Sequence, residues 1–209
     1  MPKLNFKINI ALLSSSLYVA FQLFANILST KIALLPVLNL AIDGGTVIYP
    51  FTFTLRDFVH KTWGKKASRQ VVIIAGVLNF VMVFLFWLVG KMTPDPSWSY
   101  QSAYEVILLP VFRITLASVF SQIVSELIDT EIFSLVYKKT NDVLAVFFSN
   151  LAGLLVDSLI FSFAAFGGVL PLRTVFEIML ANILIKLVLT IISVPTIKLI
   201  PRGVNQEEI

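Results

Sequence analysis

The chain contains no cysteine and a single histidine, His60, among its 209 residues. The first absence excludes a disulfide framework and cysteine-ligated metal, and the second removes most histidine-based metal sites and catalytic triads. Charged residues are also scarce: they make up 13% of the chain against 57% hydrophobic residues, and the mean hydropathy is +0.90. This composition lies far outside the range of ordinary soluble domains. It predicts an all-α, polytopic helical membrane protein.

Apolar stretches recur along the whole length of the chain. A helix needs about 20 residues to cross a bilayer, so the chain has room for about six spans within one membrane domain, residues 1–209. The expected spans are 8–35, 46–60, 69–90, 106–136, 143–167 and 174–199. The second span is short and carries Pro50, Arg56 and Asp57, so a re-entrant or broken segment is an alternative there.

Basic residues are distributed unevenly between the two predicted sides of the membrane. The external loops hold only Lys91 and Arg173. The other side holds Lys3, Lys7, Lys61, Lys65, Lys66, Arg69, Lys138, Lys139, Lys198 and Arg202. By the positive-inside rule, both termini are expected in the cytoplasm, and the bias favours a second span that crosses the membrane fully. Since this rule explains the basic clusters, they require no nucleic-acid partner.

Polar residues inside the expected spans form stripes at helical spacing. Gln122, Glu126 and Asp129 follow one another at four and then three residues, which places them on one face of the fourth helix. Pairs on the fifth and sixth helices share faces in the same way: Asn150 with Asp157, and Asn182 with Lys186. Intramembrane carboxylates are costly in lipid, so these faces are expected to point into the bundle.

Two interpretations of these stripes remain open. The groups could simply pair with one another and join helices, which we favour for Arg113, Glu131 and Arg56 because residues near span ends can reach the interface. Three converging polar stripes exceed what helix joining needs, however, and they offer several donors and acceptors to a polar guest. The catalytic motifs of common hydrolases and phosphate-binding enzymes do not occur in the chain. We therefore expect a binding or transport site, with no enzyme activity, metal or cofactor.

Several segments resemble one family of membrane transporters. They include Asp43-Gly44-Gly45-Thr46, Tyr49-Pro50-Phe51-Thr52-Phe53 with Asp57, and the run from Trp63 to Arg69. They also include Asn26 to Lys31, Gln122 to Phe133 and Asn150 to Gly168. Their order and spacing resemble the queuosine precursor transporter family, earlier named the VUT family of integral membrane proteins. This chain departs from the family at Lys61, where a glutamate is common, so any coupling or selectivity role of that glutamate is in question here.

The resemblance implies import of a small molecule, a 7-deazaguanine precursor of queuosine, across the bacterial inner membrane by a multi-pass protein. In this interpretation Glu126 or Asp129 grips the donor edge of the base, amides complete the hydrogen bonding, a lysine holds the carbonyl or balances a carboxylate, and a phenylalanine stacks. The substrate-binding candidates are Asn26, Lys31, Phe51, Phe53, Gln122, Glu126, Asp129, Phe133, Asn150, Asp157, Asn182 and Lys186. Structural or gating roles fall to Asp43, Gly44, Gly45, Pro50, Arg56 and Asp57.

Two other functions compete with import by this chain alone. One is the substrate-capturing membrane subunit of an energy-coupling factor vitamin importer, which has similar length and span count and needs an ATPase partner. Against it, the first and third spans show no convincing Ala-x-x-x-Ala docking seam. The other is a structural or assembly membrane protein. The expected partners of the chain are a small-molecule substrate and the lipid bilayer. A homodimer is an alternative to a monomer, because the chain has only about six helices.

Overall fold

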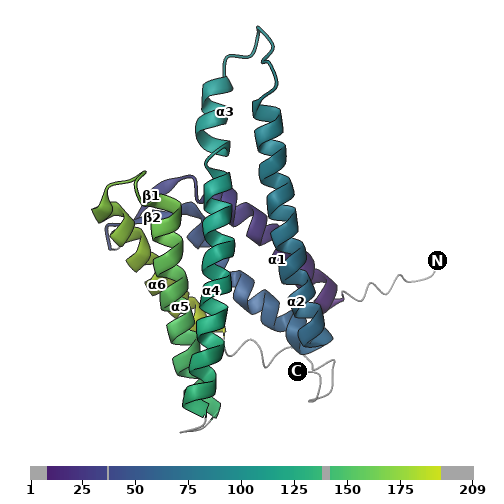
Figure 1. Cartoon of the computed structure of the whole chain (residues 1–209), viewed down its shortest axis with the longest axis vertical. Helices are drawn as coiled ribbons and strands as arrows, with labels where there is room; N and C mark the ends of the chain where they lie inside the picture. The colour runs from purple at the N-terminus through teal and green to yellow at the C-terminus, as the bar shows by residue number, and fades with distance from the viewer. Residues whose placement is uncertain (1–8, 37, 138–141, 194–209) are drawn as a thin grey trace, which may run out of the picture.

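The computed structural model describes residues 9–36, 38–137 and 142–193. In chain order its elements are α1 (Ile10–Leu28), β1 (Ile32–Leu35), β2 (Leu40–Asp43), the 3-10 helix η1 (Gly44–Val47), α2 (Tyr49–Gly90), α3 (Gln101–Leu108), α4 (Val111–Tyr137), α5 (Asp142–Phe166) and α6 (Leu172–Ser193). Helices dominate, which confirms the predicted all-α class. Figure 1 shows α4 and α5 side by side, with α1 running obliquely behind α2, against which it packs.

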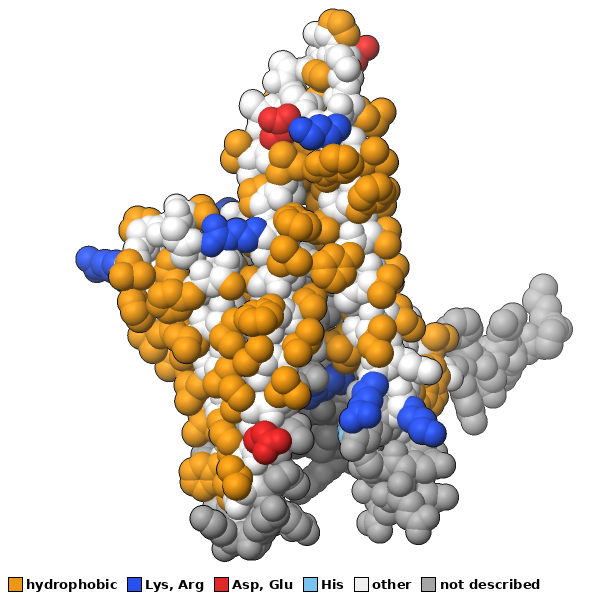
Figure 2. All heavy atoms as spheres, in the orientation of Figure 1, with side chains coloured by type: hydrophobic (Ala, Val, Ile, Leu, Met, Phe, Trp, Pro, Cys, Tyr) orange, Lys and Arg blue, Asp and Glu red, His pale blue; other side chains and the backbone are white. Residues whose placement is uncertain are grey.

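Three helices of the described chain are long and apolar enough to cross a membrane. They are Ile10–Leu28, Lys66–Gly90 and Gln101–Ser125, and the shorter helical stretch Leu151–Phe166 is also apolar. Large apolar side chains cover much of the outer surface in Figure 2, as expected for a surface that faces lipid chains. The predicted six spans and the cytoplasmic position of both termini stay predictions.

The first helix is shorter than its predicted span of 8–35. It ends at Leu28, and the chain continues into a hairpin in which β1 pairs antiparallel with β2, with Ile32 opposite Asp43. Pro36 is excluded from a helix interior, and Asn39 turns the chain with a φ of 50°. The prediction was wrong at this end because short apolar strands and helix ends have the same hydropathy.

The second and third predicted spans form one unit, α2, with a sharp break at Gly64. This glycine has φ 83° and ψ 174°, a conformation that residues with a Cβ atom rarely adopt. The break divides α2 into a short segment, 49–63, and a long one, 65–90, which Figure 1 shows at a steep angle to each other. The short segment has fewer residues than the about 20 of a full span, and the break lies after it at Gly64 rather than within the predicted span 46–60.

Two apolar clusters hold the helices together. The first joins the hairpin to α4, α5 and α6 and consists of Ala41, Ile114, Ala117, Ala165, Phe166, Val175 and Ile178. The second joins α1 to α2 through Tyr18, Val59, Val71 and Ala75. Arg113 reinforces the first cluster, since its Nε donates to the carbonyl of Ala164 at 2.8 Å, near the C-terminus of α5. A cation is favourable there because it offsets the negative end of the helix dipole.

The loop between α2 and α3 is anchored by its own polar contacts. The side-chain hydroxyl of Ser97 donates to Asp95 at 2.6 Å and its backbone N–H donates at 2.8 Å. These two hydrogen bonds stabilise the carboxylate and hold the pKa of Asp95 below its usual range. At the base of the loop, the Tyr104 hydroxyl donates to the Phe86 carbonyl at 3.1 Å, which ties α3 to α2.

Candidate functional site

A narrow polar pocket lies where η1 meets the helices of the bundle. Its lining comes from seven elements: Ala25, Asn26 and Ser29 at the end of α1, Asp43 at the end of β2, Gly45 and Thr46 in η1, Tyr49 on α2, Ser118 and Ser121 on α4, Asp157 and Phe161 on α5, and Asn182 and Lys186 on α6. We call it the central pocket. Its cavity volume is about 20 Å³, about the space that one water molecule needs.

Asp43 connects three of these elements. It ends β2 and caps η1, and its Oδ1 accepts hydrogen bonds from the Ser29 hydroxyl at 2.7 Å and the Gly45 backbone N–H at 3.0 Å. Its Oδ2 accepts from the Thr46 hydroxyl at 2.8 Å and the Asn182 amide at 3.1 Å. The residue is 1% exposed. Four donors therefore replace the water that this buried carboxylate has lost.

The glycines beside Asp43 allow η1 to approach the end of α1. A Cβ atom on Gly44 would lie 2.5 Å from the Leu28 carbonyl oxygen, and one on Gly45 would lie 2.5 Å from that of Ala25. Real Cβ atoms do not approach so closely, so any larger residue would push η1 away from α1. The close approach in turn brings Asp43 within reach of Ser29.

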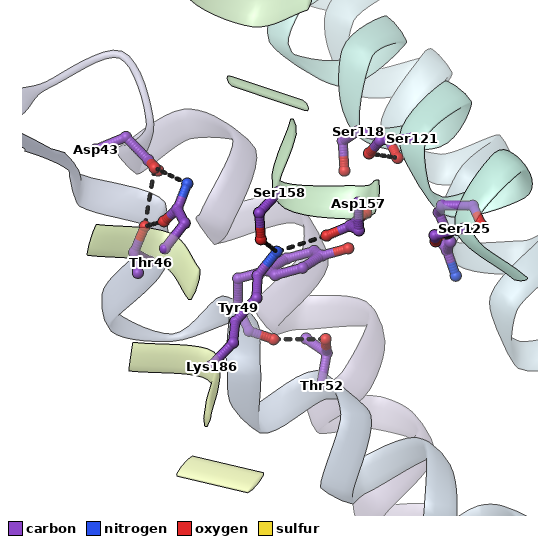
Figure 3. A network of polar contacts seen from close by, with 12 residues as sticks. Asp43, Thr46, Tyr49, Thr52, Ser118, Ser121, Ser125, Asp157, Ser158 and Lys186 are labelled. Carbon is purple, nitrogen blue, oxygen red and sulfur yellow. Dashed lines mark hydrogen bonds and ion pairs between the residues drawn. The ribbon is translucent and has the colours of Figure 1, made fainter. Parts of the chain in front are cut away.

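A buried ion pair forms the opposite wall of the central pocket. The Lys186 Nζ of α6 lies 2.5 Å from Asp157 Oδ2 of α5 and donates to the Ser158 hydroxyl at 3.3 Å. The same Nζ lies 5.2 Å from the centre of the Tyr49 ring, a cation–π contact. Asp157 and Lys186 are each 4% exposed. Figure 3 shows the pair and the Tyr49 ring converging from α5, α6 and α2.

Small polar residues on α4 complete the pocket. Ser118 and Ser121 are buried and line it, and the Ser121 hydroxyl donates to the Ser118 carbonyl at 3.0 Å. Across from them, the Asn26 amide donates to Asn79 Oδ1 at 2.6 Å, and the Asn79 amide donates to the Ala75 carbonyl at 2.9 Å. This chain of amides joins α1 to the long segment of α2 beside the pocket.

A second pocket lies next to the central one. It is lined by Tyr18 and Gln22 of α1, Tyr49, Thr52, Phe53 and Arg56 of α2, and Gln122 of α4. The Phe53 ring packs edge-on against Tyr49 with the ring centres 5.6 Å apart, and the Arg56 guanidinium lies 5.9 Å from the centre of the Phe53 ring. Tyr49 belongs to both linings.

The structure gathers some of the predicted site residues and separates others. The central pocket contains Asn26, Asp43, Gly45, Asp157, Asn182 and Lys186, and the second pocket contains Phe53, Arg56 and Gln122. Lys31 is exposed and lines neither pocket, and Phe51 is 45% exposed on the outer surface. Gly44 supports η1, and Pro50 lies buried in the first turn of α2. Predictions for the side chains of Asp57, Lys61, Glu126, Asp129, Phe133 and Asn150 lie outside what the structure describes.

Sequence reasoning missed several residues of the central pocket. Thr46 and Tyr49 stand in the motif around η1 but were not proposed for the site. Ser118 and Ser121 could have been found by extending the polar stripe of α4, since Ser118 lies four residues before Gln122. Ser29 could have been found in the same way, since Gln22, Asn26 and Ser29 follow one another at four and then three residues.

Fold and pocket together define a helical membrane protein with a buried polar pocket between its helices. More particularly, the chain belongs to the family described as "Putative vitamin uptake transporter", whose model matches residues 43–200, well over half of its length. A similar protein is the "Probable queuosine precursor transporter" of Bacillus subtilis (strain 168), 25% identical over 155 residues that cover 72% of this chain and 68% of the relative. No solved structure matches the chain.

Family membership confirms the resemblance seen in the motifs and the expectation that the chain is a transporter rather than an enzyme. Within the part of the chain that the structure describes, no group of three or more His, Asp or Glu side chains is placed to hold a metal ion.

Proposed function

We propose that this protein imports a 7-deazaguanine precursor of queuosine across the bacterial inner membrane and that the central pocket binds the substrate. The observation that carries the proposal is the buried Asp157–Lys186 pair at the wall of a polar pocket in a vitamin uptake transporter family member. The name of the Bacillus subtilis relative supports the substrate class.

The pair matches the recognition edge of such a base. A deazaguanine presents a carbonyl oxygen followed by a ring N–H and an amino group, that is, one acceptor beside two donors. Lys186 can donate to the carbonyl while Asp157 accepts from the two N–H groups. Asp43 already accepts four hydrogen bonds, so it is less suited to this task than Asp157. The rings of Tyr49 and Phe161 offer faces for stacking.

The small cavity supports a transport cycle rather than a permanently open site. A volume of about 20 Å³ cannot hold a flat bicyclic base, so substrate binding requires the surrounding elements to separate. Asp43 and Asn182 hold η1 to α6 by hydrogen bonds, which can break and re-form. Alternating exposure of the pocket to the two sides of the membrane follows from such movements.

Ligand-induced stabilisation of the purified protein tests the substrate class. A ligand that binds only the folded state raises the melting temperature by mass action. We expect a rise with 7-deazaguanines for the wild type and for the control Glu105→Gln, an exposed acid in α3, and no rise for Asp157→Asn. Uptake of radiolabelled base by proteoliposomes should follow the same order. An equal rise in Asp157→Asn would overturn the site assignment.

A panel of vitamins in the same assay separates the proposal from the competing importer subunit. If a vitamin alone stabilises the protein, and uptake requires an added ATPase partner, the energy-coupling factor interpretation replaces ours. If no ligand of either class stabilises it, the structural or assembly role gains support.

The multi-pass arrangement and a homodimeric state belong to the same proposal. Six spans with both termini in the cytoplasm agree with the distribution of basic residues in the sequence. The homodimer is tested by the molar mass of the detergent-solubilised protein, with detergent mass subtracted.

A further inference from the structure

The central pocket and the second pocket are adjacent, because Tyr49 lines both and the same helices contribute polar residues to each. On α1, Tyr18 and Gln22 line the second pocket, and Asn26, four residues further, lines the central one. On α4, the neighbours Ser121 and Gln122 divide between the two pockets in the same way. Two helices thus continue their polar faces from one pocket into the other.

Tyr49 stands where the two pockets meet. Its ring lies 5.2 Å from the Lys186 Nζ in the central pocket and 5.6 Å from the Phe53 ring in the second. Figure 3 shows the ring extending from the start of α2 towards Asp157 and Lys186. Because only Ile48 separates Tyr49 from the end of η1, a movement of η1 away from α1 or α6 is expected to move this ring as well.

With the cytoplasmic side assigned from the basic residues of the sequence, the second pocket lies on the inward side of the central one. The short segment of α2 begins at Tyr49, passes Arg56 and reaches Gly64, after which Lys66 and Arg69 follow. Lysines and arginines at the end of a span favour the cytoplasmic side. A path from the central pocket past Tyr49 to Arg56 therefore leads towards the cytoplasm.

We propose that Tyr49 is the inner gate of the transporter and that the second pocket is the vestibule through which substrate leaves. In the closed state the Tyr49 ring separates the substrate site from Arg56 and Gln122. Rotation of the ring joins the pockets, and the Phe53 face and the polar groups of the vestibule then receive a flat, polar heteroaromatic base. The gate deepens the transport function proposed above, but its test needs no substrate.

The absence of cysteine from the natural sequence makes the gate directly testable. A single cysteine in place of Ser121 reports on the central pocket, and one in place of Gln122 reports on the vestibule. Each is introduced with Tyr49 intact, with Tyr49→Ala, and with the control Phe51→Ala, which removes a ring that lines neither pocket. A membrane-impermeant thiol reagent is then applied from the inside or the outside of oriented vesicles.

With Tyr49 intact, we expect the Gln122→Cys protein to react from the inside and the Ser121→Cys protein to react slowly. In Tyr49→Ala, the labelling rate of Ser121→Cys from the inside should rise by about tenfold, as for a site that passes from a closed to an open local state. Phe51→Ala and Tyr49→Phe should leave that rate unchanged.

Three results would overturn the gate. They are an unchanged rate in Tyr49→Ala, an equal rise in Phe51→Ala, and labelling of Gln122→Cys from the outside only. Each variant is first checked for a monodisperse elution profile, and Tyr49→Val replaces Tyr49→Ala if the latter does not fold. Because labelling is measured without ligand, a wrong substrate class leaves this result intact.

Discussion

At the scale of single residues, the central pocket holds two buried carboxylates in different surroundings. Asp43 accepts hydrogen bonds from four neutral donors, whereas Asp157 faces the ammonium group of Lys186. The donors of Asp43 come from α1, η1 and α6, so its first task is to hold these elements together. Asp157 is paired with the Lys186 side chain, which can rotate to bind a substrate, so we expect this pair to bind the substrate.

Replacing Asp43 with asparagine should destabilise the protein. The new amide NH₂ group would face the Asn182 NH₂ group, and a buried donor without an acceptor costs about 1–3 kcal/mol. Thermal unfolding in detergent measures the loss as a lower melting temperature. Asp95→Asn is the control, because Asp95 accepts from Ser97 in an exposed loop where water can replace the carboxylate. Equal melting temperatures for the two variants would contradict the role of Asp43.

The Asp157–Lys186 pair should show strong energetic coupling. Either Asp157→Asn or Lys186→Met leaves one buried charge without its partner, which costs about 3–5 kcal/mol. The double variant removes both charges, so we expect it to be more stable than either single variant while binding no deazaguanine. Denaturant unfolding of the four proteins gives the coupling energy. Losses that simply add would show that the two charges are independent.

At the scale of elements, the break in α2 determines where the site lies. The short segment 49–63 carries Tyr49, Phe53 and Arg56 to the pockets, while the long segment 65–90 packs outside and carries Asn79 to Asn26. A continuous helix could not place both sets of residues against α1. The turn at Gly64 therefore allows one helix to contribute residues both to the pockets and to the contact with Asn26.

Substitution of Gly64 by alanine should weaken the fold. A residue with a Cβ atom at φ 83° and ψ 174° costs about 1–3 kcal/mol. Gly76→Ala in the same helix is the control, since a Cβ there meets no atom within 4 Å and helix propensity favours alanine by up to about 1 kcal/mol. Melting temperatures should move in opposite directions. A shift of the same sign in both would contradict the strained turn.

At the scale of the whole molecule, the distribution of basic residues predicts the orientation in the membrane. A cysteine in place of Ser97, in the exposed loop between α2 and α3, should react with an impermeant maleimide in intact cells. A cysteine in place of Lys66 should react only after the membrane is permeabilised. The reverse pattern would place both termini outside and would also reverse the direction of the vestibule.

Much of the architecture could be predicted because its signals are local. The polar stripes on α5 and α6 identified Asp157, Asn182 and Lys186 as site candidates, and the central pocket contains all three. The break in α2 lies at Gly64, between the second and third predicted spans, whereas the sequence suggested a break within 46–60 only as an alternative. The hairpin of β1 and β2 was not predicted, because the apolar residues of β1 were assigned to the end of the first span, 8–35. Lys31 was proposed for the site from its position after Asn26, but α1 ends between them and the side chain lies on the surface.

The sequence by itself determined that this is a helical membrane protein with polar helix faces, because composition and residue spacing are properties of neighbouring positions. Only the tertiary structure decided which polar groups meet. Asp43 and Asn182 are 139 residues apart in the chain, and their hydrogen bond exists because η1 packs between α1 and α6. Lys186 could have paired with any of several acids. The packing of α5 on α6 brings it to Asp157, and the close approach of helices is a result of the whole fold.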